Sequence, residues 1–149
     1  NGKISFRNSI TTGEFDDSTK RSFGELPVGS YTLKPLAQWP KTFYCMFLLV
    51  ESDSDDAEVA AALLKCLEVI TSVVGPMTGD PGVIFAIVMK IVGNLLSLFI
   101  DDDYFPPYGV AHKLSSTKHL GSDGIADFAT GNISAHGGTY RVGYRLRFA

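Results

Sequence analysis

Two runs of acidic residues are the part of this chain whose residue types and spacing are best suited to chemistry. The first run is ESDSDD, from Glu51 to Asp56, and the second is DDD, from Asp101 to Asp103. Together they hold many hard oxygen ligands, which suit Ca²⁺ because that ion binds about six to eight oxygens at variable geometry. Short carboxylates on loops converge easily on one centre. We therefore predict a calcium site with the ligands Asp53, Asp55, Asp101, Asp102 and Asp103.

The stretch between the acidic runs must position them, and its pattern predicts a helical hairpin at about 56–100. The two helical segments are DAEVAAALLKCLEVITSVV and VIFAIVMKIVGNLLSLFI, separated by GPMTGDPG. Gly75 suits the left-handed position after a helix end, and Pro76 prevents continuation. Asp80 suits the N-cap of the second helix, and Pro81 suits its first position. In an antiparallel hairpin with helices of similar length, the two acidic runs meet at the base.

The charges at this base are favourable on one side and unfavourable on the other. Negative residues before the first helix face the positive end of its dipole. Three aspartates after the second helix face the negative end and one another. A bound cation would reverse that balance. The other reading is a solvated acidic loop that keeps an apolar hairpin soluble.

Acidic loops at one end of a β-sandwich, the fold expected below for this chain, are similar in layout to the calcium-binding edge of C2-type modules. The likeness is architectural, because neither the full C2 motif pattern nor an EF-hand loop is present.

Both predicted helices are amphipathic, although their polar stripes are narrow. On the first helix Glu58, Lys65 and Ser72 recur at seven-residue spacing, with Ala61, Ala62 and Glu68 beside them. The second carries a thin small or polar stripe of Ala86, Lys90, Gly93 and Ser97, with Asn94 at its edge. A helix that is otherwise apolar must be buried in protein or lipid. The residues expected to pack together or against a central strand are Leu67, Ile70, Phe85, Ile91 and Leu95.

Strand patterns surround the hairpin on both sides. Ile4 and Phe6 alternate with polar neighbours, and TFYCMFLLV (42–50) is apolar enough to be buried on both faces. At the end of the chain TYRVGYRLRFA (139–149) alternates strictly, with aromatic or aliphatic residues on one face and arginines or glycine on the other. Strands, a helical hairpin and further strands predict a mainly β fold. We expect a single domain over 1–149, an antiparallel β-sandwich with C2-like architecture and an inserted hairpin.

Composition limits the classes of protein to which this chain can belong. The chain has 149 residues, 45% hydrophobic and 19% charged, with net charge −3. That balance is typical of a globular domain and argues against nucleic acid as a partner. The chain starts at Asn1 without a methionine, which favours a trimmed product that is secreted or extracellular; an arbitrary boundary at this residue is the alternative. Cys45 and Cys66 either form one disulfide or remain two buried thiols.

We expect no enzyme activity from this sequence. It contains no nucleophile elbow, phosphate-binding loop, dinucleotide fingerprint or C-x-x-C motif. The three histidines, His112, His119 and His136, lie in turn-rich regions without metal-binding spacing, so satisfied or exposed side chains are expected.

Two functions remain from different classes. The first is a non-catalytic extracellular β-sandwich for binding or self-assembly, a structural or adhesion subunit, stabilised by Ca²⁺. Its partner is a second copy or another protein that covers the apolar surface. The alternative is a membrane-active, pore-forming toxin that inserts its apolar hairpin, with Tyr104, Phe105 and Tyr108 beside the base. Lys90 and Asn94 in the middle of the helix and the acidic runs argue against that alternative.

Overall fold

The computed structural model describes residues 38–51, 56–74, 76–99 and 103–148, together with Lys20 and Ser22. The strand expected around Ile4 and Phe6 lies outside these residues. So do most residues of the two acidic runs.

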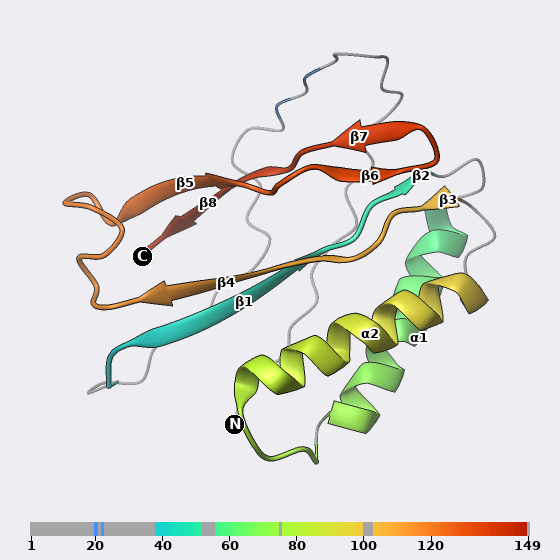
Figure 1. Ribbon diagram of the computed structural model, residues 1–149, viewed down its shortest axis with the longest axis horizontal. Helices are drawn as coiled ribbons and strands as arrows, with labels where there is room; N and C mark the ends of the chain where they lie inside the picture. Colours follow the sequence, from blue (N-terminus) through green and yellow to red (C-terminus); the bar gives the residue numbers. More distant parts are fainter. Residues whose placement is uncertain are drawn as a thin grey trace.

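An antiparallel ribbon runs through the middle of the described structure, and the two helices lie along one side of it (Figure 1). Its two ladders pair β1 (Lys41–Phe47) with β4 (Tyr108–Leu114), and β2 (Val50–Glu51) with β3 (Asp103–Tyr104). Between the ladders the N–H of Phe105 donates to the carbonyl of Leu49 at 2.9 Å. Here residues 105–107 lie opposite residues 48–49. The interruption follows from Pro106 and Pro107, which have no N–H to give to a ladder. We call β1 to β4 the first ribbon.

A second antiparallel ribbon is formed by the last part of the chain. It pairs β5 (Ile125–Ala129) with β8 (Gly143–Arg147), and β6 (Ile133–Ala135) with β7 (Gly138–Tyr140). The turn at its tip is His136–Gly137, both at positive φ. At the step between its ladders the buried Thr130 bonds Val142 twice: its N–H donates to the carbonyl at 2.9 Å, and its hydroxyl accepts the N–H at 3.0 Å. We call β5 to β8 the second ribbon.

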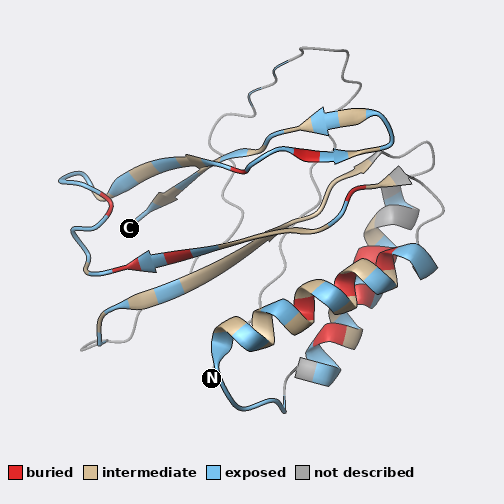
Figure 2. Ribbon diagram, in the orientation of Figure 1, coloured by how far each residue is buried: buried red, intermediate tan, exposed pale blue. Residues whose placement is uncertain are grey.

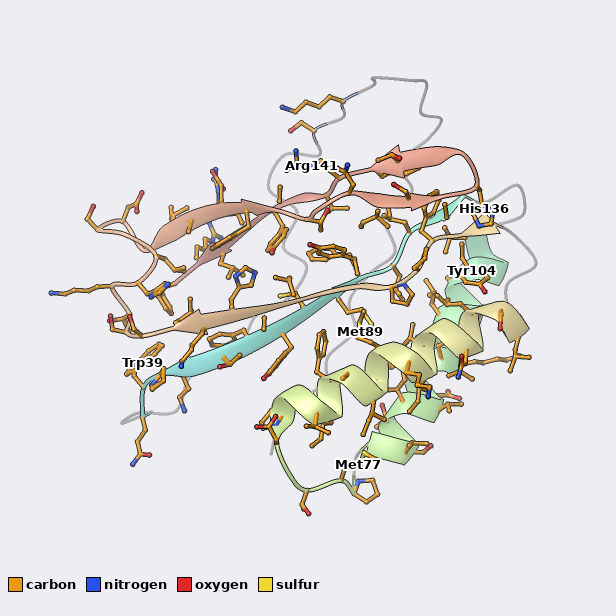
Figure 3. The ribbon with its side chains drawn as sticks, viewed as in Figure 1. Trp39, Met77, Met89, Tyr104, His136 and Arg141 are labelled. Atoms are coloured by element: carbon orange, nitrogen blue, oxygen red, sulfur yellow. The ribbon has the colours of Figure 1, made fainter. Side chains whose placement is uncertain are left out.

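The two ribbons face each other through aromatic side chains. Phe47 of the first ribbon lies 4.8 Å from Tyr144 of the second, measured between ring centroids. Nearer the tip of the second ribbon, Phe105 meets Tyr140 edge-to-face at 5.0 Å. Figure 3 shows side chains filling the space between the ribbons. Offset and edge-to-face arrangements are those that aromatic pairs prefer, so the rings fix how the two layers stack.

The helical hairpin consists of α1 (Asp56–Val74) and α2 (Pro81–Phe99). The predicted N-cap is confirmed. A carboxylate oxygen of Asp80 accepts the N–H of Gly82 at 2.8 Å and that of Val83 at 3.1 Å. Pro81 occupies the first helical position, where no N–H is needed. The short connection therefore returns the chain as a second helix packed along the first.

The core of the hairpin lies between the helices and the first ribbon (Figure 2). Val92 and Leu96 are completely buried. One expectation was wrong: Ala62 is buried, not part of the polar stripe of α1. Its small side chain lets it lie on the packed face of the helix. The core cluster contains Ala62, Leu63, Cys66, Ile70, Val88, Val92 and Leu96, with Ile91 and Leu95 packed against it.

The first ribbon has packing partners on both faces, although most residues of TFYCMFLLV are half-buried and not fully buried as their apolarity predicted. On one face Tyr44 packs against Phe85 of α2, at 4.9 Å between ring centroids. On the other, Phe47 contacts Tyr144 of the second ribbon. Gly109 permits the close approach of α2, because a Cβ there would lie 2.7 Å from the ring of Phe85. The first ribbon is thus the middle of three layers.

The described residues contain two helices and antiparallel strands in four two-stranded sheets. This is a mixed α/β arrangement, consistent with the expectation of a mainly β fold with an inserted helical hairpin.

Candidate functional site

The base of the helical hairpin is held by the short β2–β3 pair. Glu51 lies opposite Asp103, and Val50 lies opposite Tyr104. Opposite residues of an antiparallel pair have Cα atoms about 4.5–5.5 Å apart. The first residue of one acidic run is thereby directly opposite the last residue of the other.

The predicted calcium ligands differ in how far the structure describes them. Asp103 belongs to β3, and its backbone position is described. Asp53, Asp55, Asp101 and Asp102 lie outside the described residues. Within the described residues there is no group of three or more His, Cys, Asp or Glu side chains that would hold a metal ion.

The second ribbon anchors the base from the other side. The Nε2–H of His136 donates to the carbonyl oxygen of Tyr104 at 3.0 Å, and its ring meets Phe105 edge-to-face at 5.9 Å (Figure 3). Phe105 is 2% exposed. These contacts tie the tip of the second ribbon to the residues that follow the acidic run. Sequence reasoning missed this role of His136, although the turn pattern AHGGT places it at a ribbon tip.

The aromatic residues beside the base are packed within the protein. Besides the buried Phe105, Tyr104 and Tyr108 are half-buried, and the Tyr108 hydroxyl accepts the N–H of Gly131 at 2.9 Å. Phe105 and Tyr108 contact the second ribbon, and Tyr104 packs against the core of the hairpin. A membrane-facing role, which the alternative function assigns to them, would require them to leave these contacts.

The outer face of the hairpin is the main exposed apolar feature of the described structure. Leu98 is 74% exposed, Val83 60% and Leu64 53%. Lys90 and Asn94 are exposed as well, which agrees with the polar stripe expected on α2. The exposed surface of the hairpin therefore contains both apolar and polar side chains.

Helix α2 is long and apolar enough to cross a membrane. The segment Pro81–Leu98 has a mean hydropathy of 1.9, and 17% of its residues are buried. Lys90 is its single charged residue. This statement is based on length and composition alone. Core helices of other proteins share both properties.

The three histidines are satisfied by neighbouring groups, as expected. His119 Nδ1 accepts the backbone N–H of Ser115 at 3.3 Å and lies 3.0 Å from its hydroxyl. His112 Nε2 lies 2.7 Å from the hydroxyl of Tyr144. Burial lowers the pKa of His112 below its usual value. Each of the three is bonded within the protein.

Both cysteines are free thiols, which rules out the disulfide; Cys66 is buried as the other alternative expected, whereas Cys45 is half-buried. Cys66 belongs to the core of the helical hairpin. Cys45 lies near enough to Tyr144 of the second ribbon to raise the pKa of that phenol, after the larger effect of burial. The two thiols are therefore on different sides of the first ribbon. Burial raises the pKa of both, which disfavours the reactive thiolate.

No known protein family, curated protein or solved structure matches this chain. The function must therefore be argued from the residues themselves.

Proposed function

We propose that this chain is a non-catalytic, extracellular module of C2-like antiparallel β-sandwich architecture that assembles with further copies of itself through the outer face of its helical hairpin. The acidic base of the hairpin binds Ca²⁺ in this proposal. The stacking of the two ribbons supports the proposed architecture.

The observation that carries the proposal is the exposure of large apolar side chains on both helices. Leu64 of α1 and Val83 and Leu98 of α2 each leave more than half of their surface open. Exposed apolar surface of this kind marks sites where another protein or a membrane is met. The polar groups between them, Lys90 and Asn94, suit a protein interface, which tolerates polar residues near its rim.

Calcium enters the proposal through the charge at the base. Glu51 and Asp103 occupy directly opposed positions of an antiparallel pair, where like charges are unfavourable. Each is followed or preceded by further acidic residues. A divalent cation would neutralise this cluster and tighten the junction between the hairpin and the first ribbon. Its proposed ligands remain Asp53, Asp55, Asp101, Asp102 and Asp103.

The test is the mass of the protein in solution, measured by sedimentation over a range of concentrations. We expect the wild type to form dimers or larger oligomers as concentration rises. Leu98→Lys removes an exposed apolar group from α2 and should shift the chain to monomer. Ile125→Lys is the matched control, because Ile125 is a partly exposed apolar residue on the second ribbon. It should leave the oligomer intact. A wild type that stays monomeric at every concentration would rule out self-assembly.

Insertion of the hairpin into a membrane is the second candidate, favoured by the hydropathy and low burial of α2. Leakage of dye from lipid vesicles, with and without Ca²⁺, separates the two functions. Leakage by wild type that Leu98→Lys abolishes would favour insertion. Intact vesicles together with concentration-dependent mass would favour assembly.

A further inference from the structure

Polar contacts as well as aromatic rings join the two ribbons, and one of them is buried and titratable. Tyr108 bonds Gly131, and His136 bonds Tyr104, at positions open to solvent. His112 is different, because only 9% of its surface is exposed. It belongs to β4 of the first ribbon, yet its side-chain hydrogen bond goes to Tyr144 of the second.

The ring of His112 is enclosed by the second ribbon. Its centroid lies 4.4 Å from that of Phe128 and 5.6 Å from that of Tyr144. Those two rings also stack on each other, at 5.7 Å and an angle of 22° between their planes. The imidazole therefore fills a pocket made by β5 and β8, with a single hydroxyl group as its described polar partner.

We propose that His112 is a pH-sensitive latch between the two ribbons, closed while its imidazole is neutral and opened by protonation in mildly acidic solution. This inference is independent of the proposed assembly and calcium binding.

The surroundings of the imidazole explain why its charge would not be tolerated. A charged group that loses water needs an opposite charge or several hydrogen bonds nearby. The titratable groups around the pocket are the Tyr144 hydroxyl from β8, the Cys45 thiol from β1 and, on β4 itself, the Tyr108 hydroxyl, which accepts the N–H of Gly131. Burial raises the pKa of Tyr144 and of Cys45, so both are neutral near pH 6. Neither supplies the missing anion.

The charged residues of β5 and β8 are directed elsewhere, and Lys41 of β1 is a half-buried cation, which cannot supply an anion. Asp127 of β5 and Arg145 of β8 are exposed and form an ion pair with each other, with an N–O distance of 2.6 Å. Lys113, next to His112 on β4, is also exposed. The nearest carboxylate along the second ribbon is thus already paired on the outer face.

The direction of the pH effect follows from the depressed pKa. Below pH 6.5, the ordinary value for histidine, an opened or unfolded chain takes up a proton that the closed chain does not. The closed form is therefore most stable above this pH. It loses stability as the pH falls from 6.5 towards the lower pKa of the closed form, and opening exposes Phe128, Tyr144 and Phe47.

The experiment compares wild type with His112→Gln between about pH 8 and about pH 5, the range in which histidine titrates. Glutamine is neutral at every pH and retains an amide that can bond Tyr144. The midpoint of urea unfolding is followed by the fluorescence of Trp39, the sole tryptophan. Its ring meets Phe148, just after β8, at 6.2 Å. His119→Gln is the control, since it removes an exposed histidine bonded to Ser115.

We expect the midpoints of wild type and His119→Gln to fall on acidification, and that of His112→Gln to change much less. A wild-type pH dependence retained by His112→Gln would overturn the latch. If that variant does not fold, the NMR titration of the His112 ring in wild type decides: a pKa at or above 6.5 overturns the proposal, and a lower value supports it.

Hydrogen exchange of the wild type tests whether the opening is local. After correction for the intrinsic effect of pH, amides of β5 and β8 should exchange faster at about pH 5 than at about pH 8. Amides in the core of α1 and α2 should change less. An equal loss of protection in helices and ribbons would mean that protonation unfolds the whole chain, and would overturn the latch.

Discussion

Asp80 decides where the second helix begins, because one of its carboxylate oxygens accepts two backbone N–H groups of the first turn. Those N–H groups have no partner within the helix. His112 and His136 are two more single residues with such an effect. Each forms a hydrogen bond with a tyrosine of the opposite ribbon and so joins parts of the chain that are distant in sequence. Single polar side chains thus determine how the elements begin and how they are joined.

Replacing Asp80 by Ala should lower the free energy of unfolding by about 0.5–2 kcal/mol, the usual cost of losing an N-cap. Asp80→Asn keeps an oxygen acceptor and should remain close to wild type. The measurement is the urea midpoint of all three proteins. Equal midpoints for wild type and Asp80→Ala would show that the cap does not stabilise the fold.

Replacing Asp102 by Asn tests the proposed calcium site. Ca²⁺ should raise the melting temperature of wild type, because a ligand that binds only the folded state stabilises it by RT ln(1 + [L]/Kd). Asp102→Asn should abolish that rise. Without metal it should melt higher than wild type, because it relieves repulsion at the C-terminal end of α2. A solvated acidic loop would give the same relief without any calcium response in wild type. An unchanged wild-type melting curve at millimolar Ca²⁺ would therefore contradict the site.

At the scale of elements, periodicity predicts which faces are covered. In the final stretch Tyr140, Val142, Tyr144, Leu146 and Phe148 are half-buried, while Arg141, Gly143, Arg145 and Arg147 are exposed, as the alternation predicted. The pattern survives although the stretch is divided between β7 and β8, because the extra residue of the bulge is on the partner strand around Thr130. In the helices the same reasoning failed for Ala62, a small residue that fits either environment, and for Val83 and Leu98, which are exposed although the apolar pattern of α2 predicted burial.

The packing of α2 is tested by two leucines of the same helix. Leu96→Ala should destabilise the fold by about 2–5 kcal/mol, because Leu96 is completely buried in the hairpin core. Leu98→Ala makes the same chemical change at a 74% exposed position and should cost far less. Denaturant unfolding measures both. Similar losses at the two positions would mean that the hairpin packs on a different face from the one described.

At the scale of the whole molecule, the first ribbon is the layer on which both others depend. The helices pack on one of its faces through Tyr44 and Phe85, and the second ribbon packs on the other through Phe47 and Tyr144. The hairpin leaves this ribbon and returns to it through the β2–β3 pair. Any release of the hairpin towards a membrane must therefore begin by breaking its contacts with the first ribbon.

Gly109→Ala should weaken the contact between hairpin and first ribbon by about 1–3 kcal/mol, as overpacking usually does. The added methyl group would lie 2.7 Å from Phe85 and 3.0 Å from the sulfur of Met89. Gly143→Ala is the control, since its nearest neighbour is 4.0 Å away. Unfolding midpoints measure both. If the membrane candidate is correct, Gly109→Ala should also increase vesicle leakage, whereas an unaltered midpoint would show that the ring of Phe85 moves aside without cost.

The sequence by itself determined the helical hairpin, the cap at Asp80, the polar stripe of α2 and the alternation of the last strand. Each depends on dihedral preferences or on the spacing of residues close together in the chain. Only the tertiary structure decided that β1 pairs with β4 across the inserted hairpin, that Cys45 and Cys66 stay apart, and that His112 meets Tyr144. The contact of His112 with Tyr144 spans 32 residues of sequence, and the pairs between β1 and β4 span still more. Their choice depends on how whole layers fit together, because the same apolar alternation would suit several strand partners equally well.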